Sequence, residues 1–260
     1  MNKQLSLDNG HIRLTDAHRL PADEGAEYQL YFYGDIVSSK WEKYAEDDRC
    51  PQDVADLLNA IPNDVPLDIY INSGGGDVHA GIAIYHQLRR RSGANTVHID
   101  GLAASIASVI AMAGDEIIMP VSAQMMIHKP WATARGNAND LRATADVLDQ
   151  CQMSITEIYM SKVRAGVTRE RIEKMMNAEA WMTGSEAADI FQLTVENIPA
   201  AAACASEFYK KYRNTPEAVE VASGITLAAE TAICIVSEEN YQKYDNSAER
   251  LRLELALMEL

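Results

Sequence analysis

A short apolar segment, Leu67 to Asn72, runs directly into Ser73 and three consecutive glycines, Gly74 to Gly76. A helical pattern follows, with Asp77 suited to its N-cap or first turn and Gly93 placed to stop it. A strand that passes through a glycine turn into a helix is the building unit of α/β proteins. This unit constrains the chain most strongly, because it predicts parallel strands covered by helices.

The same alternation continues along the chain. We expect strands at residues 28–34, 67–72, 95–101, 116–120 and 123–128. We expect helices at residues 54–61, 77–93, 103–114, 137–162, 170–176 and 183–191, the last with Ser185 as its N-cap. Strands alternating with helices predict an α/β fold with a parallel sheet, and we find no repeat with a solenoid period.

The composition indicates a folded, acidic protein. Hydrophobic residues make up 47% and charged residues 23% of the 260 residues, enough for a sizeable core. Lys and Arg number 23 against 38 Asp and Glu, which argues against wrapping nucleic acid or binding anionic lipid. No window approaches the roughly 18 apolar residues of a membrane helix. The polar N-terminus, broken by Gly10, does not resemble a signal peptide. We therefore expect a cytoplasmic protein with no nucleic-acid or membrane partner.

The distribution of cysteines and histidines predicts no metal site and no disulfide framework. His79 and His86 can share one helix face, but no third ligand accompanies them. The glycine triplet lacks the Lys-Ser/Thr of a phosphate-binding loop, so we expect no cofactor. The four cysteines are widely spaced and suit core positions: Cys50, Cys151, Cys204 and Cys234.

The composition also divides the chain. Residues 1–26 are polar and interrupted by glycine and proline, so we interpret them as an N-terminal arm. Residues 27–198 carry the α/β pattern. Residues 199–260 form a C-terminal extension that ends in a strongly amphipathic helix, expected to pack on its own domain or on a neighbouring subunit.

Three features can carry chemistry, and each has a structural alternative. The glycine triplet can present backbone N–H groups to a developing negative charge, or can be a tight turn that needs positive φ. Ser105 lies between a strand and a helix, where it can be a nucleophile or a helix cap, and Ile106 can supply a second N–H donor. His128 ends an apolar strand, where it can be a general base or a structural histidine. Their order along the chain favours the catalytic interpretation.

Three stretches resemble the proteolytic subunit of the Clp protease: IYINSGGGDVHAGIAIYHQL, HIDGLAASIASVIAMAGD and MMIHKPWATARGNANDL. The resemblance extends from about Tyr28 to Asn197. It implies the ClpP/crotonase-like fold of parallel strands and helices, with a long handle helix at 137–162 through which rings stack. It also implies Ser105 as the nucleophile and His128 as the general base. The implied oxyanion hole consists of the N–H groups of Gly76 and Ile106, with Gly75 as the alternative to Gly76.

The sequence departs from the family pattern at two positions. The family has a proline where this chain has Gly74, which loosens the turn without removing its donors. The family has an aspartate as its third catalytic residue, and Glu179 stands at the matching position. A glutamate can orient an imidazole, but its longer side chain requires the backbone to lie further back. The alternative acids lie on the predicted handle helix: Asp140, Asp146 and Asp149.

The resemblance implies a serine endopeptidase that forms a homo-oligomeric ring and cleaves polypeptides. The Ala178-Glu179-x-Trp181 motif and the long tail look more like the Clp-type proteases of phages and prophages, which mature heads by trimming scaffold or capsid proteins. A housekeeping subunit partnered by an ATPase unfoldase is the alternative, as is a catalytically weak scaffolding protein. A crotonase-type acyl-CoA enzyme is a further hypothesis, distinguished by pocket carboxylates in place of a Ser-His pair.

Overall fold

The computed structural model describes residues 7–8, 11–13, 27–197 and 212–216, with side chains from residue 28 onward. The amphipathic helix expected at the C-terminus, Cys204 and Cys234 lie outside the described residues, as does most of the N-terminal arm. Among the described residues, no helix is both long and apolar enough to cross a bilayer.

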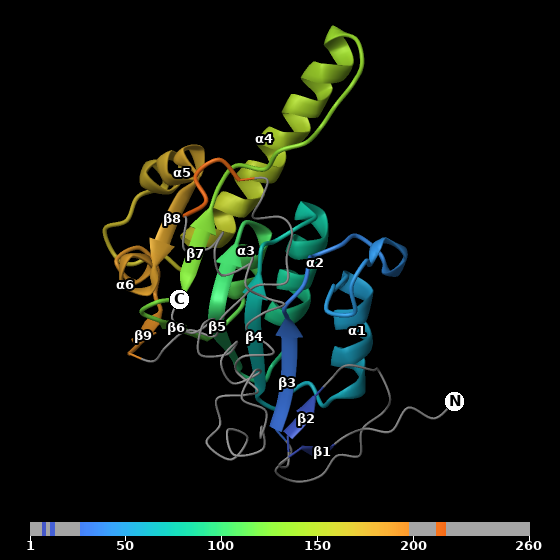
Figure 1. Cartoon of the computed structure of the whole chain (residues 1–260), viewed down its shortest axis with the longest axis vertical. Coiled ribbons are helices and arrows are strands. Elements are labelled where there is room, and N and C mark those ends of the chain that lie inside the picture. Colours follow the sequence, from blue (N-terminus) through green and yellow to red (C-terminus); the bar gives the residue numbers. More distant parts are fainter. Residues whose placement is uncertain (1–6, 9–10, 14–26, 198–211, 217–260) are drawn as a thin grey trace, which may run out of the picture.

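The described elements alternate between strands and helices, as the sequence pattern predicts (Figure 1). The strands are β1 (Leu7–Asp8), β2 (His11–Arg13), β3 (Glu27–Phe32), β4 (Leu67–Ser73), β5 (Asn95–Ala104), β6 (Glu116–Pro120), β7 (Gln124–Ile127), β8 (Ala180–Thr183) and β9 (Thr194–Glu196). The helices are the 3₁₀ turn η1 (Lys40–Glu42), α1 (Pro51–Ala60), α2 (Val78–Arg89), α3 (Ile106–Ala111), α4 (Ala138–Met160), α5 (Arg169–Ala178) and α6 (Gly184–Ala188).

The strands form a mostly parallel sheet, which confirms the predicted α/β class. The main path runs β1-β2-β3-β4-β5-β6-β9 among the described strands, and the β1–β2 pair is antiparallel. β5 divides this sheet: its first half pairs with β6, and its last residues, Leu102–Ala104, pair with β7. β8 then pairs antiparallel with β7. The β7–β8 pair therefore forms a wing at the C-terminal end of β5.

The core lies between the sheet and the helices that cover it. The buried positions of β4 alternate at its start, as expected for a strand with one face on the core. Ile69 and Val97 of the sheet pack in one cluster with Ile84 of α2 and Val109 of α3. This core fixes β4, β5 and the turns that follow them.

Two local expectations are corrected by the structure. The helix expected to begin near Ala103 begins at Ile106, because β5 continues through Ala104 to pair with β7. The N-cap expected at Ser185 is instead Thr183, whose hydroxyl accepts a hydrogen bond from the Glu186 N–H while the Glu186 carboxylate accepts from the Thr183 N–H. This reciprocal capping box starts α6 before Ser185 is reached.

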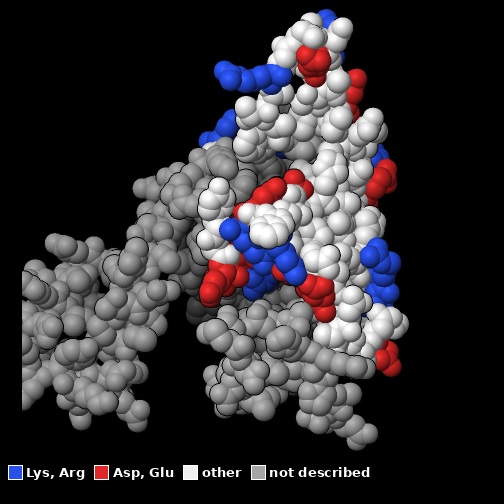
Figure 2. Space-filling model, turned by 90° about the vertical axis from the view of Figure 1, so that its right-hand side faces the viewer, with Lys and Arg blue, Asp and Glu red and all other residues white. Residues whose placement is uncertain are grey.

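Helix α4 projects from the body of the molecule (Figure 1). Asn137 caps its N-terminus, in agreement with the predicted helix at 137–162. Three large apolar side chains on the helix are exposed: Leu141 at 47%, Val147 at 49% and Met153 at 61%. On the face that Figure 2 shows, acidic and basic side chains are interspersed.

Candidate active site

Strand pairing brings the three predicted catalytic residues to one edge of the sheet. Ala104, the last residue of β5, pairs with Met126 of β7, and Ser105 follows it directly. Ile127 at the end of β7 pairs with Ala180 at the start of β8. His128 and Glu179 each lie one position beyond that antiparallel pair, on the same side. The register therefore places the serine, histidine and glutamate together although 74 residues separate the first from the last.

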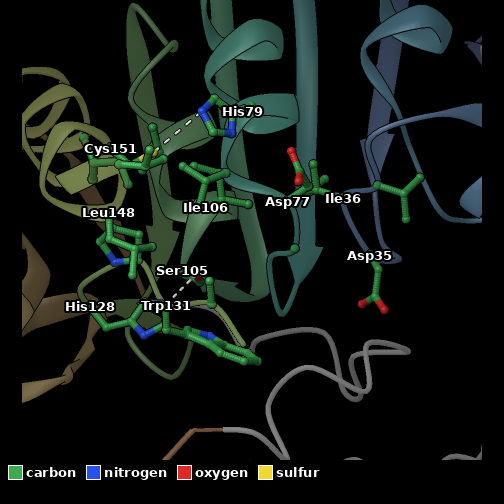
Figure 3. Close-up of a pocket in the computed structure, with 18 of the residues that line it drawn as sticks. Asp35, Ile36, Asp77, His79, Ser105, Ile106, His128, Trp131, Leu148 and Cys151 are labelled. Atoms are coloured by element: carbon green, nitrogen blue, oxygen red, sulfur yellow. Dashed lines mark hydrogen bonds between the residues drawn. The ribbon is translucent and has the colours of Figure 1, made fainter. Parts of the chain in front are cut away.

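The side chains of Ser105 and His128 are in contact. Ser105 Oγ lies 2.7 Å from His128 Nε2, a contact marked by the dashed line beside Ser105 in Figure 3. Ser105 occupies the N-cap position of α3, yet its side chain makes no capping hydrogen bond. Its backbone has a φ of 54° and a ψ of -126°, outside the regions that L-residues favour. Strained backbone of this kind costs about 1–3 kcal/mol and persists where the surrounding structure enforces it.

A buried network beneath Ser105 enforces this conformation. The Ser105 N–H donates to the Met126 carbonyl over 2.9 Å. The Ser108 hydroxyl lies 2.6 Å from the Ser105 carbonyl oxygen and 2.7 Å from the Tyr159 hydroxyl. Ser108 and Tyr159 are both buried, and burial raises the pKa of the Tyr159 phenol, which keeps it neutral. The backbone on both sides of the serine is thus held by β7, α3 and α4.

The glycine turn lies directly against the serine. A Cβ atom built on Gly75 would lie 2.8 Å from both the Ala104 carbonyl oxygen and Ser105 Cβ. Gly75 and Gly76 have φ values of 103° and 148°, so the turn needs glycine at both positions. The Gly75 N–H donates to Ser73 Oγ over 3.1 Å. Among the described residues, no acceptor pairs with the Gly76 or Ile106 N–H, so these two donors remain available beside the serine.

Glu179 lies near His128 but is held by a different part of the chain. It ends α5 in a left-handed conformation, with a φ of 53°, and is 5% exposed. Its Oε1 accepts a hydrogen bond from the Asn214 N–H over 2.6 Å. Its Oε2 lies 3.8 Å from Arg213 Nε. Among the described residues, Glu179 makes no hydrogen bond to His128, although its charge acts on that imidazole.

Burial is the main influence on His128. It lowers the pKa of the imidazole from 6.5 to about 4, because the charged form loses hydration. The Glu179 carboxylate opposes this shift, and the Arg213 guanidinium adds to it. At neutral pH the imidazole is therefore unprotonated, the form in which Nε2 can accept a proton from Ser105.

The serine and histidine open into a cavity of about 740 Å³. Figure 3 shows Ile36, Ile106 and Leu148 around it, and Trp131 also lines it. A largely apolar cavity with a few convergent polar groups is typical of a site that binds part of a substrate.

Several other predicted candidates lie away from the serine–histidine pair. The alternative acids are exposed on α4: Asp140, Asp146 and Asp149. His79 lines the same cavity, where its Nε2 lies 3.6 Å from the thiol of buried Cys151. Within the described part of the chain, no three His, Cys, Asp or Glu side chains lie close enough together to hold a metal ion.

Sequence reasoning missed five residues that contact the site. Ser108 and Tyr159 carry no distinguishing signal, because a serine in a small-residue helix and a tyrosine in an amphipathic helix both suit ordinary packing. Tyr212, Arg213 and Asn214 lie in the C-terminal extension, for which the sequence predicts only a closing amphipathic helix. Their role depends on the return of the chain to β7 and β8, which no local pattern encodes.

Comparison with known proteins identifies the same family that the sequence motifs resemble. The family model described as Clp protease matches residues 46–190, more than half of the chain. The chain is 35% identical over 129 residues to the ATP-dependent Clp protease proteolytic subunit 1 of Chlamydia abortus, covering 48% of this chain and 66% of the relative. It is 36% identical over 127 residues to the protein of the same name in Chlamydia trachomatis serovar D, covering 47% and 65%.

A third relative is the ATP-dependent Clp protease proteolytic subunit of Bacteroides fragilis, 32% identical over 133 residues, with 50% of this chain and 63% of the relative covered. The chain thus spans just under two thirds of the length of these relatives. The matched residues 46–190 include the glycine turn, Ser105, His128 and Glu179. By this match, the chain belongs to the Clp protease family.

Proposed function

We propose that this protein is a serine endopeptidase of the Clp type, with polypeptides as its substrates. The observation that carries the proposal is the 2.7 Å contact between Ser105 Oγ and His128 Nε2. A hydroxyl paired with an unprotonated imidazole, at a strained turn facing a cavity, is an arrangement that activates a nucleophile. The same pair separates the peptidase hypothesis from the acyl-CoA one, which does not require it.

In this proposal His128 Nε2 takes the Ser105 proton as Oγ attacks the carbonyl carbon of the scissile peptide. The N–H groups of Gly76 and Ile106 stabilise the negative oxygen of the tetrahedral intermediate. Its collapse breaks the C–N bond, and His128 gives the proton to the leaving amine. Water then attacks the acyl carbon with the same imidazole as base, the bond between that carbon and Ser105 Oγ breaks, and His128 returns the proton to Oγ. Glu179 stabilises the imidazolium that forms in each step.

The preference for Gly76 over Gly75 follows from hydrogen bonding. The Gly75 N–H already donates to Ser73 Oγ, and that bond would have to break before it could reach an oxyanion. The Gly76 N–H and the Ile106 N–H, at the positive end of α3, carry no such cost.

The assembly is part of the proposal. We propose a homo-oligomeric ring that stacks through α4, supported by the exposed Leu141, Val147 and Met153 on that projecting helix. Residues 27–198 are the proposed peptidase unit, and residues 199–260 the extension. The resemblance to phage and prophage proteases supports scaffold or capsid proteins as substrates. The names of the relatives support the alternative of an ATPase partner.

Peptide hydrolysis tests the proposed chemistry. Wild type, Ser105→Ala and His128→Ala are compared on a mixed fluorogenic peptide library at matched oligomer mass. We expect wild-type turnover and a loss of kcat/KM on the order of 10⁴-fold or more in each variant. Hydrolysis that survives Ser105→Ala, or no hydrolysis by assembled wild type, would sink the proposal and favour the scaffolding role.

The partner is tested separately. If an ATPase is required, a folded protein substrate is degraded only with ATP and a host lysate containing the unfoldase. If phage head proteins are the substrates, scaffold or capsid subunits are trimmed by the purified enzyme without nucleotide.

A further inference from the structure

Residues 212–216 lie against the candidate active site, although they come after the region that the family model matches. Figure 1 shows this short segment beside the ends of β7 and β8. Tyr212 is 8% exposed and packs in a small apolar cluster with Leu102, Ala104 and Met126, separate from the main core. Trp181 of β8 packs against the same cluster. The segment is thus anchored on the wing that carries His128 and Glu179.

Tyr212 connects the glycine turn to the histidine. Its hydroxyl donates a hydrogen bond to the Gly74 carbonyl. Its ring meets the His128 ring edge-on, with centroids 5.1 Å apart and planes at 77°. Gly74 precedes the two glycines with positive φ, so fixing its carbonyl restricts the turn that presents the Gly76 N–H. One side chain therefore restrains both the proposed oxyanion donor and the proposed base.

The next two residues hold the carboxylate of Glu179. The Asn214 N–H donates to Oε1 over 2.6 Å, and Arg213 Nε lies 3.8 Å from Oε2. The Asn214 side-chain amide donates to the Ala178 carbonyl over 3.0 Å, which fixes the segment to the end of α5. A buried carboxylate is costly without donors, and here the segment supplies them. The carboxylate is thereby fixed in place next to His128.

The segment lies beside the nucleophile and leaves the catalytic contact intact. Tyr212 forms part of the cavity wall together with Ser105 and His128. The 2.7 Å contact between Ser105 and His128 is present while the segment is docked. This arrangement differs from a segment that blocks the site, which would separate or cover the reacting atoms.

We propose that Tyr212, Arg213 and Asn214 are positioning residues of the active site: Tyr212 holds the glycine turn and the His128 ring, and Arg213 and Asn214 hold Glu179. This inference rests on the proposed peptidase function. The same segment contacts the site at both positions where the sequence departs from the family pattern, Gly74 and Glu179.

The sharpest test removes one backbone N–H. Asn214→Pro lacks the donor to Glu179, whereas the matched control Asn214→Ala keeps it and loses only the side-chain amide. We expect Asn214→Pro to lower kcat about ten- to hundredfold relative to Asn214→Ala, with KM within about threefold. Both variants are made in the full-length chain. Their kcat values are compared directly if the two melting temperatures are equal, and otherwise after correction for the fraction of folded protein.

A second pair tests Tyr212 without removing its ring. Tyr212→Phe keeps the contact with His128 and deletes the hydrogen bond to Gly74, so we expect a fall of about three- to thirtyfold in kcat. Tyr212→Leu removes the aromatic contact as well, and we expect a larger fall.

A pH profile separates positioning from a merely structural role. Within the part of the chain that the structure describes, the charged groups that act on His128 are Glu179, at the end of α5, and Arg213. Arg213→Gln removes the positive charge, so the acid limb of kcat/KM should move to higher pH. Arg213→Lys, the conservative variant, should restore the wild-type position.

These measurements distinguish the inference from the proposed function. If wild type hydrolyses peptides through Ser105 but Asn214→Pro matches Asn214→Ala and Tyr212→Phe matches wild type, the inference alone is wrong. An increase in kcat in these variants also overturns it, because the segment would then be inhibitory. Absence of Ser105-dependent hydrolysis in wild type contradicts the proposed function and the inference together.

Discussion

The hydroxyl oxygens of Ser108 and Tyr159 lie 2.7 Å apart, directly beneath the backbone of Ser105. Ser108 also reaches the Ser105 carbonyl, so α4 is linked to the proposed nucleophile through two buried hydroxyls. These buried hydrogen bonds, together with strand pairing, therefore stabilise the strained φ of Ser105.

This network predicts a characteristic stability pattern. Ser108→Ala leaves the buried Tyr159 hydroxyl without that partner, and the expected loss is about 1–3 kcal/mol in the free energy of unfolding. Tyr159→Phe removes the other side of the contact. The double variant should lose less than the sum of the two single losses, as measured by urea denaturation in a double-mutant cycle. Strict additivity would show that the two hydroxyls do not stabilise each other.

The glycine turn predicts a difference between two alanine substitutions. Gly75→Ala introduces a Cβ at 2.8 Å from Ser105 Cβ, on a backbone with a φ of 103°. Gly166 has a φ of 91° but nothing within 4 Å of its Cβ position, so Gly166→Ala carries the backbone strain without the collision.

We expect Gly166→Ala to cost about 1 kcal/mol and to retain full activity. Gly75→Ala should cost more and lower kcat at least about a hundredfold, because it displaces the nucleophile and the oxyanion donors. Thermal unfolding and peptide hydrolysis on the same samples provide the comparison. Equal activity in the two variants would contradict the proposed close packing of the turn and the serine.

The buried imidazole predicts an unusual pH dependence. His128 must be unprotonated to act as a base, and burial lowers its pKa to about 4. As the pH is lowered, kcat/KM should therefore fall to half of its maximum near pH 4, well below the ordinary histidine pKa of 6.5. A half-maximal kcat/KM at or above pH 6.5 would contradict the assignment of His128 as the base. The profile should be recorded where the protein remains folded, since acid unfolding would produce a steeper loss.

Glu179 predicts a change in both rate and pH dependence. Its charge raises the pKa of His128, so Glu179→Gln should move the acid limb to still lower pH. The amide cannot stabilise an imidazolium as a carboxylate does, and kcat should fall on the order of a hundredfold or more. Asp149→Asn, on exposed α4, serves as the matched acid control and should leave both quantities unchanged.

The exposed apolar residues of α4 predict that charged substitutions on this helix weaken assembly. Placing carboxylates at Leu141 and Met153, 47% and 61% exposed, should destabilise a stacked interface with little effect on protomer folding. The double variant Leu141→Asp/Met153→Asp should lower the native particle mass, measured by analytical ultracentrifugation. Asp146→Asn is the control on the same helix. An unchanged mass in the aspartate variant would exclude α4 from the proposed stacking contact between rings.

Much of the fold could be predicted from the sequence because its signals are local. The helix at 137–162 and the strands around Ile69 and Val97 follow directly from periodicity, and the glycine turn marks its own position. The start of α3 could not be placed, since Ala103 and Ala104 suit either element and only pairing with β7 makes them strand.

The candidate site likewise has a part that local sequence signals predict and a part that they do not. Ser105 and His128 stand next to strong local signals, and the structure brings them into contact. The surroundings of Glu179 depend on Arg213 and Asn214, more than 30 residues further along the chain, and no local pattern indicates that contact. The Ser108–Tyr159 contact is hidden for the same reason.

The most direct test of the central claim is covalent labelling of the assembled wild-type protein with a fluorophosphonate probe, read by tandem mass spectrometry of the modified peptide. We expect one adduct per chain on Ser105, none on the neighbouring Ser108, and none at either position in His128→Ala. A probe that labels Ser105→Ala as strongly as wild type, or an assembled wild type that takes up no probe, would contradict the assignment of Ser105 as an activated nucleophile.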